Sequence, residues 1–332
     1  MRMFGASALR VCLLCAVAGS ASAGCKVDVV FQHAPKHTNH FEQVLARAEN
    51  GDPTAQFQAA VALETGEGTA QDYAAAVKWY RRAADAGSAA AQNNLGGMYL
   101  RGLGVAQDDR EALGWYSRAA GEGYLPAENN VGFMKAAGRG TQADDEDAVR
   151  WYRRAAEKGY APAQANLAFM YSMGRGVPLD GSAAVSWYQK AVAQKYAPAQ
   201  YKLGLLYFEG KVVAQDLAEG LRWLRTAAEH GSAAAENEIA YAYEHGQGVG
   251  QNYVDAAKWY RRAAEHGLPE ARQNLEILAS RQEHASPAGA SEASGMKIAI
   301  SECALGCGHT VTAGTSGVES PGTSRNWEAK DR

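Results

Sequence analysis

Apolar residues along the middle of the chain recur with the spacing of a helix face. One face of an α-helix repeats every three or four residues, and this spacing joins Ala76, Trp79, Tyr80, Ala83, Ala84 and Gly87. A second run has the same spacing and consists of Ala91, Leu95, Met98 and Tyr99. It stops at Gly102, because glycine easily takes the positive φ of a helix end. The pattern predicts two amphipathic helices, which we call the second helix of one unit and the first helix of the next.

This pair of helices repeats at a fixed length. Six tryptophans lie 36 residues apart, at Trp79, Trp115, Trp151, Trp187, Trp223 and Trp259. The turn inside a unit repeats as well: Gly102 and Gly104 reverse the chain, and Asp108 is placed to cap the next helix. A fixed period of this size is typical of stacked repeats. A helical bundle is the alternative, but it gives no reason for identical length and turn chemistry in six consecutive units.

These residues resemble the Sel1-like repeat, a relative of the tetratricopeptide repeat. In the second unit the shared motif consists of Ala91, Leu95-Gly96, Tyr99, Gly102-Leu103-Gly104-Val105, Asp108, Ala112, Trp115-Tyr116, Ala119-Ala120 and Gly123. The resemblance covers Pro53 to Gly267. It implies an all-α fold, a right-handed α-solenoid of helix-turn-helix repeats like the TPR and Sel1-like superhelices, in which the first helix of each unit lines the concave face.

The fifth unit departs most from the motif. It has Val212 in place of the second turn glycine, Gly220 in place of an alanine and Leu224 in place of a tyrosine. We therefore expect looser packing near residues 210–225. Elsewhere the large side chains should pack between units, so we expect Trp151 to be buried between repeats.

The periodicity divides the chain into segments. We predict a linker and capping helix at 24–52, six repeats of 36 residues at 53–268 and a C-terminal capping helix at 269–284, because terminal repeats need polar caps. Residues 285–332 lose the periodicity and are rich in Ser, Gly, Thr and Ala, which predicts a disordered tail.

The N-terminus predicts export. Residues 1–23 combine two arginines, an apolar run and the small residues that a signal peptidase accepts. A membrane anchor is the alternative, but the run of eight apolar residues spans only about 12 Å as a helix, against about 30 Å of hydrocarbon. The protein is then periplasmic or secreted. Cys25 ends a sequence that resembles a lipobox, although Ser22 stands where leucine is favoured, so lipidation at Cys25 in an outer-membrane lipoprotein is the minority alternative.

Charge argues against a nucleic-acid partner, and hydropathy argues against a membrane-spanning helix. The formal net charge is −3 and becomes −5 without residues 1–23, so the chain lacks the basic character of a nucleic-acid binder. Beyond the N-terminus no apolar run approaches the roughly 20 residues of a membrane span. We predict neither a nucleic-acid partner nor a membrane-spanning helix.

Candidate chemistry lies outside the repeats. Ser294 and Lys297 have the Ser-x-x-Lys spacing of penicillin-interacting serine enzymes, but the partner motifs of that class are missing from the sequence. Two groups have metal-binding residue types: His33, His37 and His40, and Cys303, Cys307 and His309. The alternatives are solvated linker residues and a small disulfide between Cys303 and Cys307. We predict no catalytic residue, no metal and no cofactor.

A ladder of polar residues precedes the apolar residue in the middle of each first helix. Its members are Asn94, Asn130, Asn166, Lys202 and Glu238. Asparagine donates and accepts hydrogen bonds at once, which suits the backbone of an extended peptide. The alternative is that these amides only bond to the backbone of the neighbouring repeat.

The resemblance implies a function in protein binding. We expect an exported, non-catalytic scaffold that binds another protein or an extended peptide on its concave face. The alternative is an enzyme or receptor acting on cell-wall material or β-lactams, since some secreted, cysteine-rich relatives are associated with β-lactams. Those relatives carry a cysteine pair in each repeat, and this chain has no cysteine between Cys25 and Cys303.

Overall fold

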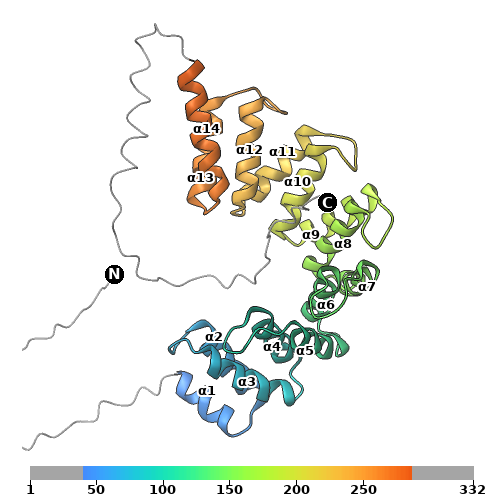
Figure 1. Ribbon diagram of the computed structural model, residues 1–332, viewed down its shortest axis with the longest axis vertical. Coiled ribbons are helices and arrows are strands. Elements are labelled where there is room, and N and C mark those ends of the chain that lie inside the picture. Colours follow the sequence, from blue (N-terminus) through green and yellow to red (C-terminus); the bar gives the residue numbers. More distant parts are fainter. Residues whose placement is uncertain (1–39, 286–332) are drawn as a thin grey trace, which may run out of the picture. The chain divides into compact units, whose positions relative to one another are not determined.

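The computed structural model describes residues 40–285, which form fourteen α-helices and no strand within that range (Figure 1). The first helices of the six repeats are α2 (Pro53–Thr65), α4 (Ala89–Arg101), α6 (Leu125–Ala137), α8 (Ala161–Met173), α10 (Ala197–Glu209) and α12 (Ala233–His245). The second helices are α3 (Tyr73–Asp85), α5 (Asp109–Gly121), α7 (Asp145–Glu157), α9 (Gly181–Ala193), α11 (Leu217–Glu229) and α13 (Tyr253–Glu265). Before them lies α1 (His40–Glu49), and after them α14 (Pro269–Ala285). The predicted all-α, helix-turn-helix repeat fold is confirmed.

Two compact units make up the described chain, and each is described on its own. The first holds residues 40–134 and 138–142, and the second holds 135–137 and 143–285. In both units the two helices of a repeat pack against each other, as in α4 with α5 and α10 with α11. The second helix also packs on the first helix of the next repeat, as in α3 with α4 and α11 with α12.

The turns form as the glycine and aspartate pattern predicts. Gly102 ends α4 with a φ of 67°, and Asp108 accepts a hydrogen bond of 2.9 Å from the backbone N–H of Arg110 at the start of α5. That bond satisfies an N–H group that has no partner inside the helix. Gly104 lies so close to the preceding repeat that a Cβ would be 2.3 Å from the carbonyl oxygen of Tyr73. Only glycine allows this contact.

The fifth repeat makes the same close contact, but its glycine lies in the preceding repeat and not in the turn. Here the turn carries Val212, and the residue that it approaches is Gly181, whose Cβ would lie 2.3 Å from the Val212 carbonyl oxygen. Gly220 likewise brings α11 close to α10, because its Cβ would lie 2.9 Å from the backbone nitrogen of Phe208. The expectation of looser packing near residues 210–225 is therefore wrong for these contacts.

The tyrosine of each Trp-Tyr pair, and not the tryptophan, is the side chain most consistently buried. Tyr152 is 4% exposed and belongs to the core of the second unit, whereas Trp151 is half-buried. The guanidinium carbon of Arg154 lies 5.4 Å from the centroid of the Trp151 ring. The expected burial of Trp151 between repeats is wrong, because its ring is half-buried beside Arg154 while Tyr152 occupies the core.

Several predictions concern residues outside the described range. They are the signal peptide at 1–23, Cys25, the tail beyond Ala285, and the candidate chemistry at His33, His37, Ser294, Lys297, Cys303, Cys307 and His309. Within residues 40–285, no helix is both long and apolar enough to cross a membrane. The same range holds no group of three or more side chains arranged to bind a metal ion.

Candidate binding surface

The first helices of the second unit share one row of side chains that runs along the edge of the core and is half-buried to exposed. In α12, Glu238, Tyr241 and His245 follow each other at intervals of three and four residues, while Ile239 and Ala242 on the adjoining face are buried. The corresponding residues of the second unit are Asn166, Phe169 and Met173 in α8, Lys202, Leu205 and Glu209 in α10, and Asn274, Ile277 and Arg281 in α14. We call these residues, together with those of α12, the stripe.

In the first unit the ladder asparagines bond to neighbouring side chains. Asn94 in α4 donates through Nδ2 to the Tyr80 hydroxyl at 3.1 Å. Asn130 in α6 donates to the side-chain oxygen of Asn93 in α4 at 2.9 Å, which joins the first helices of two consecutive repeats. Sequence reasoning had named the neighbouring backbone as the alternative partner of these amides, and the partners are side chains. Both asparagines therefore contribute to the stacking of the repeats.

In the second unit the ladder carries charge. Asn166 is half-buried in α8, and Lys202 is exposed in α10. Glu238 is half-buried in α12, where burial and, more weakly, the charge of Glu209 raise its pKa, while a hydrogen bond with Asn237 opposes that rise. The structure thus places all three predicted residues on the stripe, with a cation and an acid on consecutive first helices.

Sequence reasoning missed the apolar residues of the stripe. Each of them lies three residues after a polar residue of the stripe: Phe169, Leu205, Tyr241 and Ile277. Phe169 and Leu205 are half-buried, while Tyr241 and Ile277 each remain 40% exposed. Met173, one turn further along α8, is 57% exposed. The pattern was readable in the sequence, because the same place is apolar in every first helix from α6 onward.

A glutamate, a tyrosine and an arginine form the same cluster in each unit: Glu64, Tyr80 and Arg101 in the first, and Glu244, Tyr260 and Arg281 in the second. Glu244 accepts hydrogen bonds from the Tyr260 hydroxyl and from the Arg281 guanidinium, both at 2.8 Å. Burial and the neighbouring carboxylate raise the pKa of Tyr260 far above its ordinary value, so the hydroxyl stays protonated. The cluster fixes α12, α13 and α14 to one another and holds Arg281 in the stripe.

Another carboxylate of the second unit is fully buried. Glu236 in α12 forms an ion pair of 2.6 Å with Arg262 and a contact of 2.8 Å with the Nδ1 of His266, and both partners lie in or next to α13. A buried charge needs such compensation. Glu236 is therefore part of the packing between α12 and α13.

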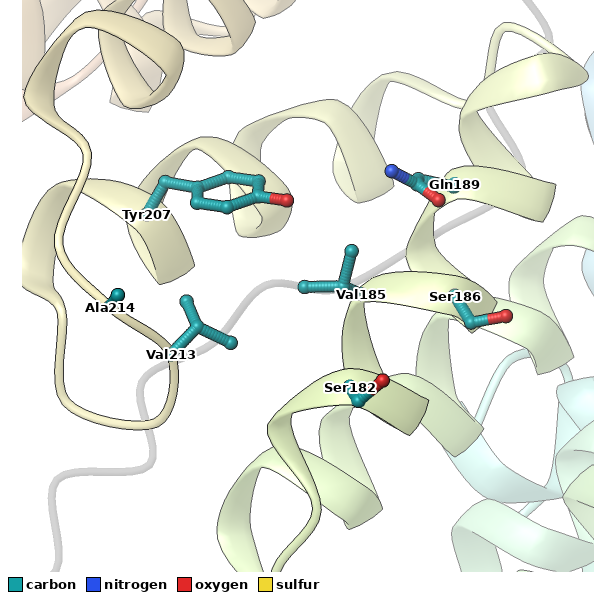
Figure 2. A pocket seen from close by; sticks show the side chains of 7 residues that line it. All are labelled: Ser182, Val185, Ser186, Gln189, Tyr207, Val213 and Ala214. Carbon is teal, nitrogen blue, oxygen red and sulfur yellow. The ribbon is translucent and has the colours of Figure 1, made fainter.

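A shallow groove of about 430 Å³ lies beside the fifth repeat (Figure 2). Its lining consists of Ser182, Val185, Ser186 and Gln189 from α9, Tyr207 from α10, and Val213 and Ala214 from the turn that follows. Figure 2 shows these side chains on three separate segments of the second unit. The lining holds hydroxyl and amide groups but no charged side chain, and it contains none of the residues of the stripe.

Comparison with known proteins identifies the family. The Sel1 repeat family matches six consecutive segments, at 53–88, 89–124, 125–160, 161–196, 197–232 and 233–268. The chain therefore belongs to the Sel1 repeat family. Proteins of this family are typically scaffolds for protein–protein interaction and are generally non-catalytic.

Two solved structures are similar to this chain. A Sel1 repeat protein from Oxalobacter formigenes is 33% identical over 68% of this chain and 95% of its own, with a TM-score of 0.62. A protective antigen of uropathogenic Escherichia coli strains, which displays an SLR fold, is 33% identical over 76% of this chain and 53% of its own, with a TM-score of 0.62. This chain thus spans about half the length of that antigen. No curated protein matches the chain.

Proposed function

We propose that this chain is an exported, non-catalytic scaffold that binds another protein or an extended peptide through the stripe. Family membership supports protein binding. The observation that carries the choice of surface is the exposure of large apolar side chains on it, 57% for Met173 and 40% for both Tyr241 and Ile277. Exposed apolar residues gathered on one face and flanked by polar ones are typical of an interaction site.

The two kinds of stripe residue have different tasks in this proposal. Burying a large apolar side chain contributes about 1.5–3 kcal/mol, whereas a net hydrogen bond contributes about 0.5–1.5 kcal/mol. Tyr241 and Ile277 therefore supply most of the affinity. The ladder residues Lys202 and Glu238 orient the ligand through their charges, and Asn166 adds a polar contact in the same unit.

Photo-crosslinking in living cells tests the choice of surface. A photoreactive phenylalanine analogue in place of Tyr241 should give a discrete crosslinked product after irradiation. The matched control is the same analogue in place of Tyr253, which lies on α13 with 43% of its surface exposed. Equal products from both positions, or no product from Tyr241, would contradict binding through the stripe.

Export is tested separately. The proposal rests on the sequence of residues 1–23, and it expects an envelope or secreted form that begins at Gly24. The intact mass of that form measures it. An acylated chain beginning at Cys25 would replace this route with lipidation, and an intact Met1 on the exported protein would contradict cleavage.

A further inference from the structure

We propose that the turn after α10, residues 210–216, is a flap that opens away from α9 and closes on it while the helices stay packed. The inference goes beyond the proposed function, because the groove beside this turn contains none of the residues of the stripe. It is carried by comparing the flap with the turns at 174–180 and 246–252, which occupy the same place in the fourth and sixth repeats.

The turn at 174–180 is connected to the preceding repeat by an ion pair. Arg175 binds both carboxylate oxygens of Asp145 at the start of α7, at 2.6 and 3.0 Å. The equivalent residues of the flap and of α9 are Lys211 and Gly181, and Gly181 has no side chain to bind. Lys211 instead pairs at 3.1 Å with Glu209, which lies two residues before it. That pair does not connect the flap to α9.

A hydrogen bond between α7 and α8 is also missing one repeat later. Arg153 on α7 donates through its guanidinium to the Tyr171 hydroxyl on α8 at 3.0 Å. Gln189 on α9 and Tyr207 on α10 occupy the equivalent places, and within residues 40–285 no hydrogen bond joins them. Both line the groove, and Figure 2 shows their side chains apart on separate helices. The groove therefore lies open where an arginine crosses the preceding joint.

The valine of the flap is packed differently from its equivalents. Val177 and Val249 pack against the core clusters of their own parts of the second unit. Val213 lines the groove instead, and Figure 2 shows it apart from Val185 on α9. The residue on the second helix responds to this difference, since Val149 is 3% exposed and Val185 is half-buried. The flap thus leaves α9 incompletely covered.

The turn at 246–252 is held by apolar contacts. Leu217, at the start of α11, stands where α9 has Gly181, and it packs against the same core cluster as Val249. A Cβ on Gly248 would lie 2.8 Å from the Cβ of Leu217, so that turn rests directly on α11. The flap keeps the backbone contact between Gly181 and Val212. It lacks the ion pair and the apolar packing that hold the two other turns.

The helices beside the flap stay packed when it opens. Tyr188 on α9 and Leu203 on α10 belong to one core cluster and are 2% and 0% exposed. Opening is therefore confined to the flap, and local openings of this kind need less free energy than unfolding of the whole protein. The open flap exposes the apolar surface of Val185 and Val213, and the closed flap covers part of it.

Residue-resolved hydrogen exchange of the full chain tests the inference. Three equivalent backbone N–H groups hold the ends of the three turns, each donating to a carbonyl of its own first helix: Asp180 to Tyr171 at 3.1 Å, Asp216 to Tyr207 at 2.9 Å and Asn252 to Tyr243 at 2.8 Å. Such a group exchanges when its turn opens. After correction for intrinsic rates, Asp216 should exchange about tenfold or more faster than Asp180 and Asn252, since each missing connection shifts the opening equilibrium by up to about that factor.

One variant makes the turn at 174–180 resemble the flap. Asp145→Ala removes the carboxylate that α9 lacks at Gly181, so it should raise the exchange rate of Asp180 about five- to tenfold. The matched control is Glu146→Ala, which removes an exposed acid from the same helix turn and should leave that rate unchanged.

A second variant closes the flap. Gln189→Arg gives α9 the residue that α7 has at Arg153, so it should donate to the Tyr207 hydroxyl and slow the exchange of Asp216 about threefold or more. Adding Tyr207→Phe to this variant removes the acceptor and should cancel the change. Circular dichroism confirms that each variant folds.

Other results would overturn the inference. They are exchange at Asp216 no faster than at Asp180 and Asn252, an unchanged rate of Asp180 in Asp145→Ala, and an unchanged rate of Asp216 in Gln189→Arg. None of these results touches the proposed function, because crosslinking through position 241 judges that function on a separate surface.

Discussion

The α-carbon of Gly181, at the start of α9, lies directly against the carbonyl oxygen of Val212, and a Cβ on residue 181 would be 2.3 Å from that oxygen. In the third and fourth repeats the turn supplies the glycine instead, since a Cβ on Gly140 would lie 2.3 Å from the carbonyl oxygen of Asp109 and one on Gly176 would lie 2.2 Å from that of Asp145. Each contact needs one glycine, which either the turn or the preceding repeat can supply.

This contact predicts the effect of adding one methyl group. Gly181→Ala should destabilise the protein by about 1–3 kcal/mol, because the backbone of the turn must move to accept the side chain. The control is Gly114→Ala in α5, where a Cβ meets no atom within 4 Å and where alanine should stabilise the helix by about 0.5–1 kcal/mol. Urea unfolding measures both. Equal effects of the two substitutions would show that the close contact is not constraining.

The burial of the aromatic pair predicts an order of stability losses. Tyr152→Ala should cost about 3–5 kcal/mol, as expected for a buried aromatic side chain, and Trp151→Ala should cost clearly less because that ring is half-buried. Neighbouring repeats share the loss, because stability in a repeat array is coupled between units. Thermal unfolding followed by circular dichroism gives the order. A larger loss for Trp151→Ala would show that the half-buried ring carries the packing between helices.

A strained backbone at the end of the fourth repeat predicts a stabilising substitution. Lys195 has a φ of 61° at a place where Gly159 has 89° and Gly231 has 83°. A left-handed backbone costs a residue with a Cβ about 1–2 kcal/mol, and glycine removes that cost. Glycine also gives the unfolded chain more freedom, which takes back about 0.4–1 kcal/mol of the gain. Lys195→Gly should therefore raise the urea midpoint slightly.

The reverse change is its control. Gly159→Lys should lower the urea midpoint by a similar amount, because a Cβ at Gly159 meets no atom within 4 Å and only the backbone is strained. A lower midpoint for Lys195→Gly would contradict the account.

The raised pKa of Glu238 predicts a pH-dependent effect of neutralising it. Below the ordinary carboxyl pKa of 4.5, the folded and unfolded forms both keep the proton. As the pH rises, the unfolded chain ionises first, so the folded form loses relative stability until the pH passes the raised pKa. Glu238→Gln should therefore be more stable than the unaltered protein at neutral pH, with the difference vanishing at low pH.

Unfolding measured across the pH range checks this expectation. Glu229→Gln, at the exposed end of α11, is the control for removing one carboxylate. If Glu238→Gln makes the protein less stable at neutral pH, the ionised carboxylate is stabilised in the fold and the expectation fails.

The sequence left two roles open for the ladder, ligand binding and bonding to the neighbouring repeat, and the bond between Asn130 and Asn93 predicts the second for Asn130. Asn130→Ala should lower the free energy of unfolding by about 0.5–1.5 kcal/mol, since it removes a bond between two first helices. Lys202→Ala should leave stability unchanged, because the side chain is exposed. If Asn130→Ala leaves the free energy of unfolding unchanged, the bond does not stabilise the stacking, and ligand binding is the remaining role for Asn130.

The sequence predicted those parts of the fold that depend on neighbouring residues. Gly102 and Asp108 mark the turn between α4 and α5 because a positive φ and an N-cap are decided within a few residues. The ladder could also be predicted, since Lys202 and Glu238 occupy the same place in units of one fixed length. The stripe as a surface was not predicted: its apolar residues recur at one repeat position, but the sequence does not show which apolar positions of a helix stay exposed.

By itself, then, the sequence determined the repeat length, the helices and their turns, which follow from local backbone preference and from helical periodicity. The tertiary structure alone decided that Gly181 replaces the glycine missing at Val212, that Tyr152 is buried and Trp151 is not, and that Asn130 bonds to Asn93. The two contacts join residues 31 and 37 positions apart, and the third case distinguishes adjacent residues by their neighbours in space. Packing chooses among side chains that local preference treats as equal, because the energy of a contact depends on which atoms meet.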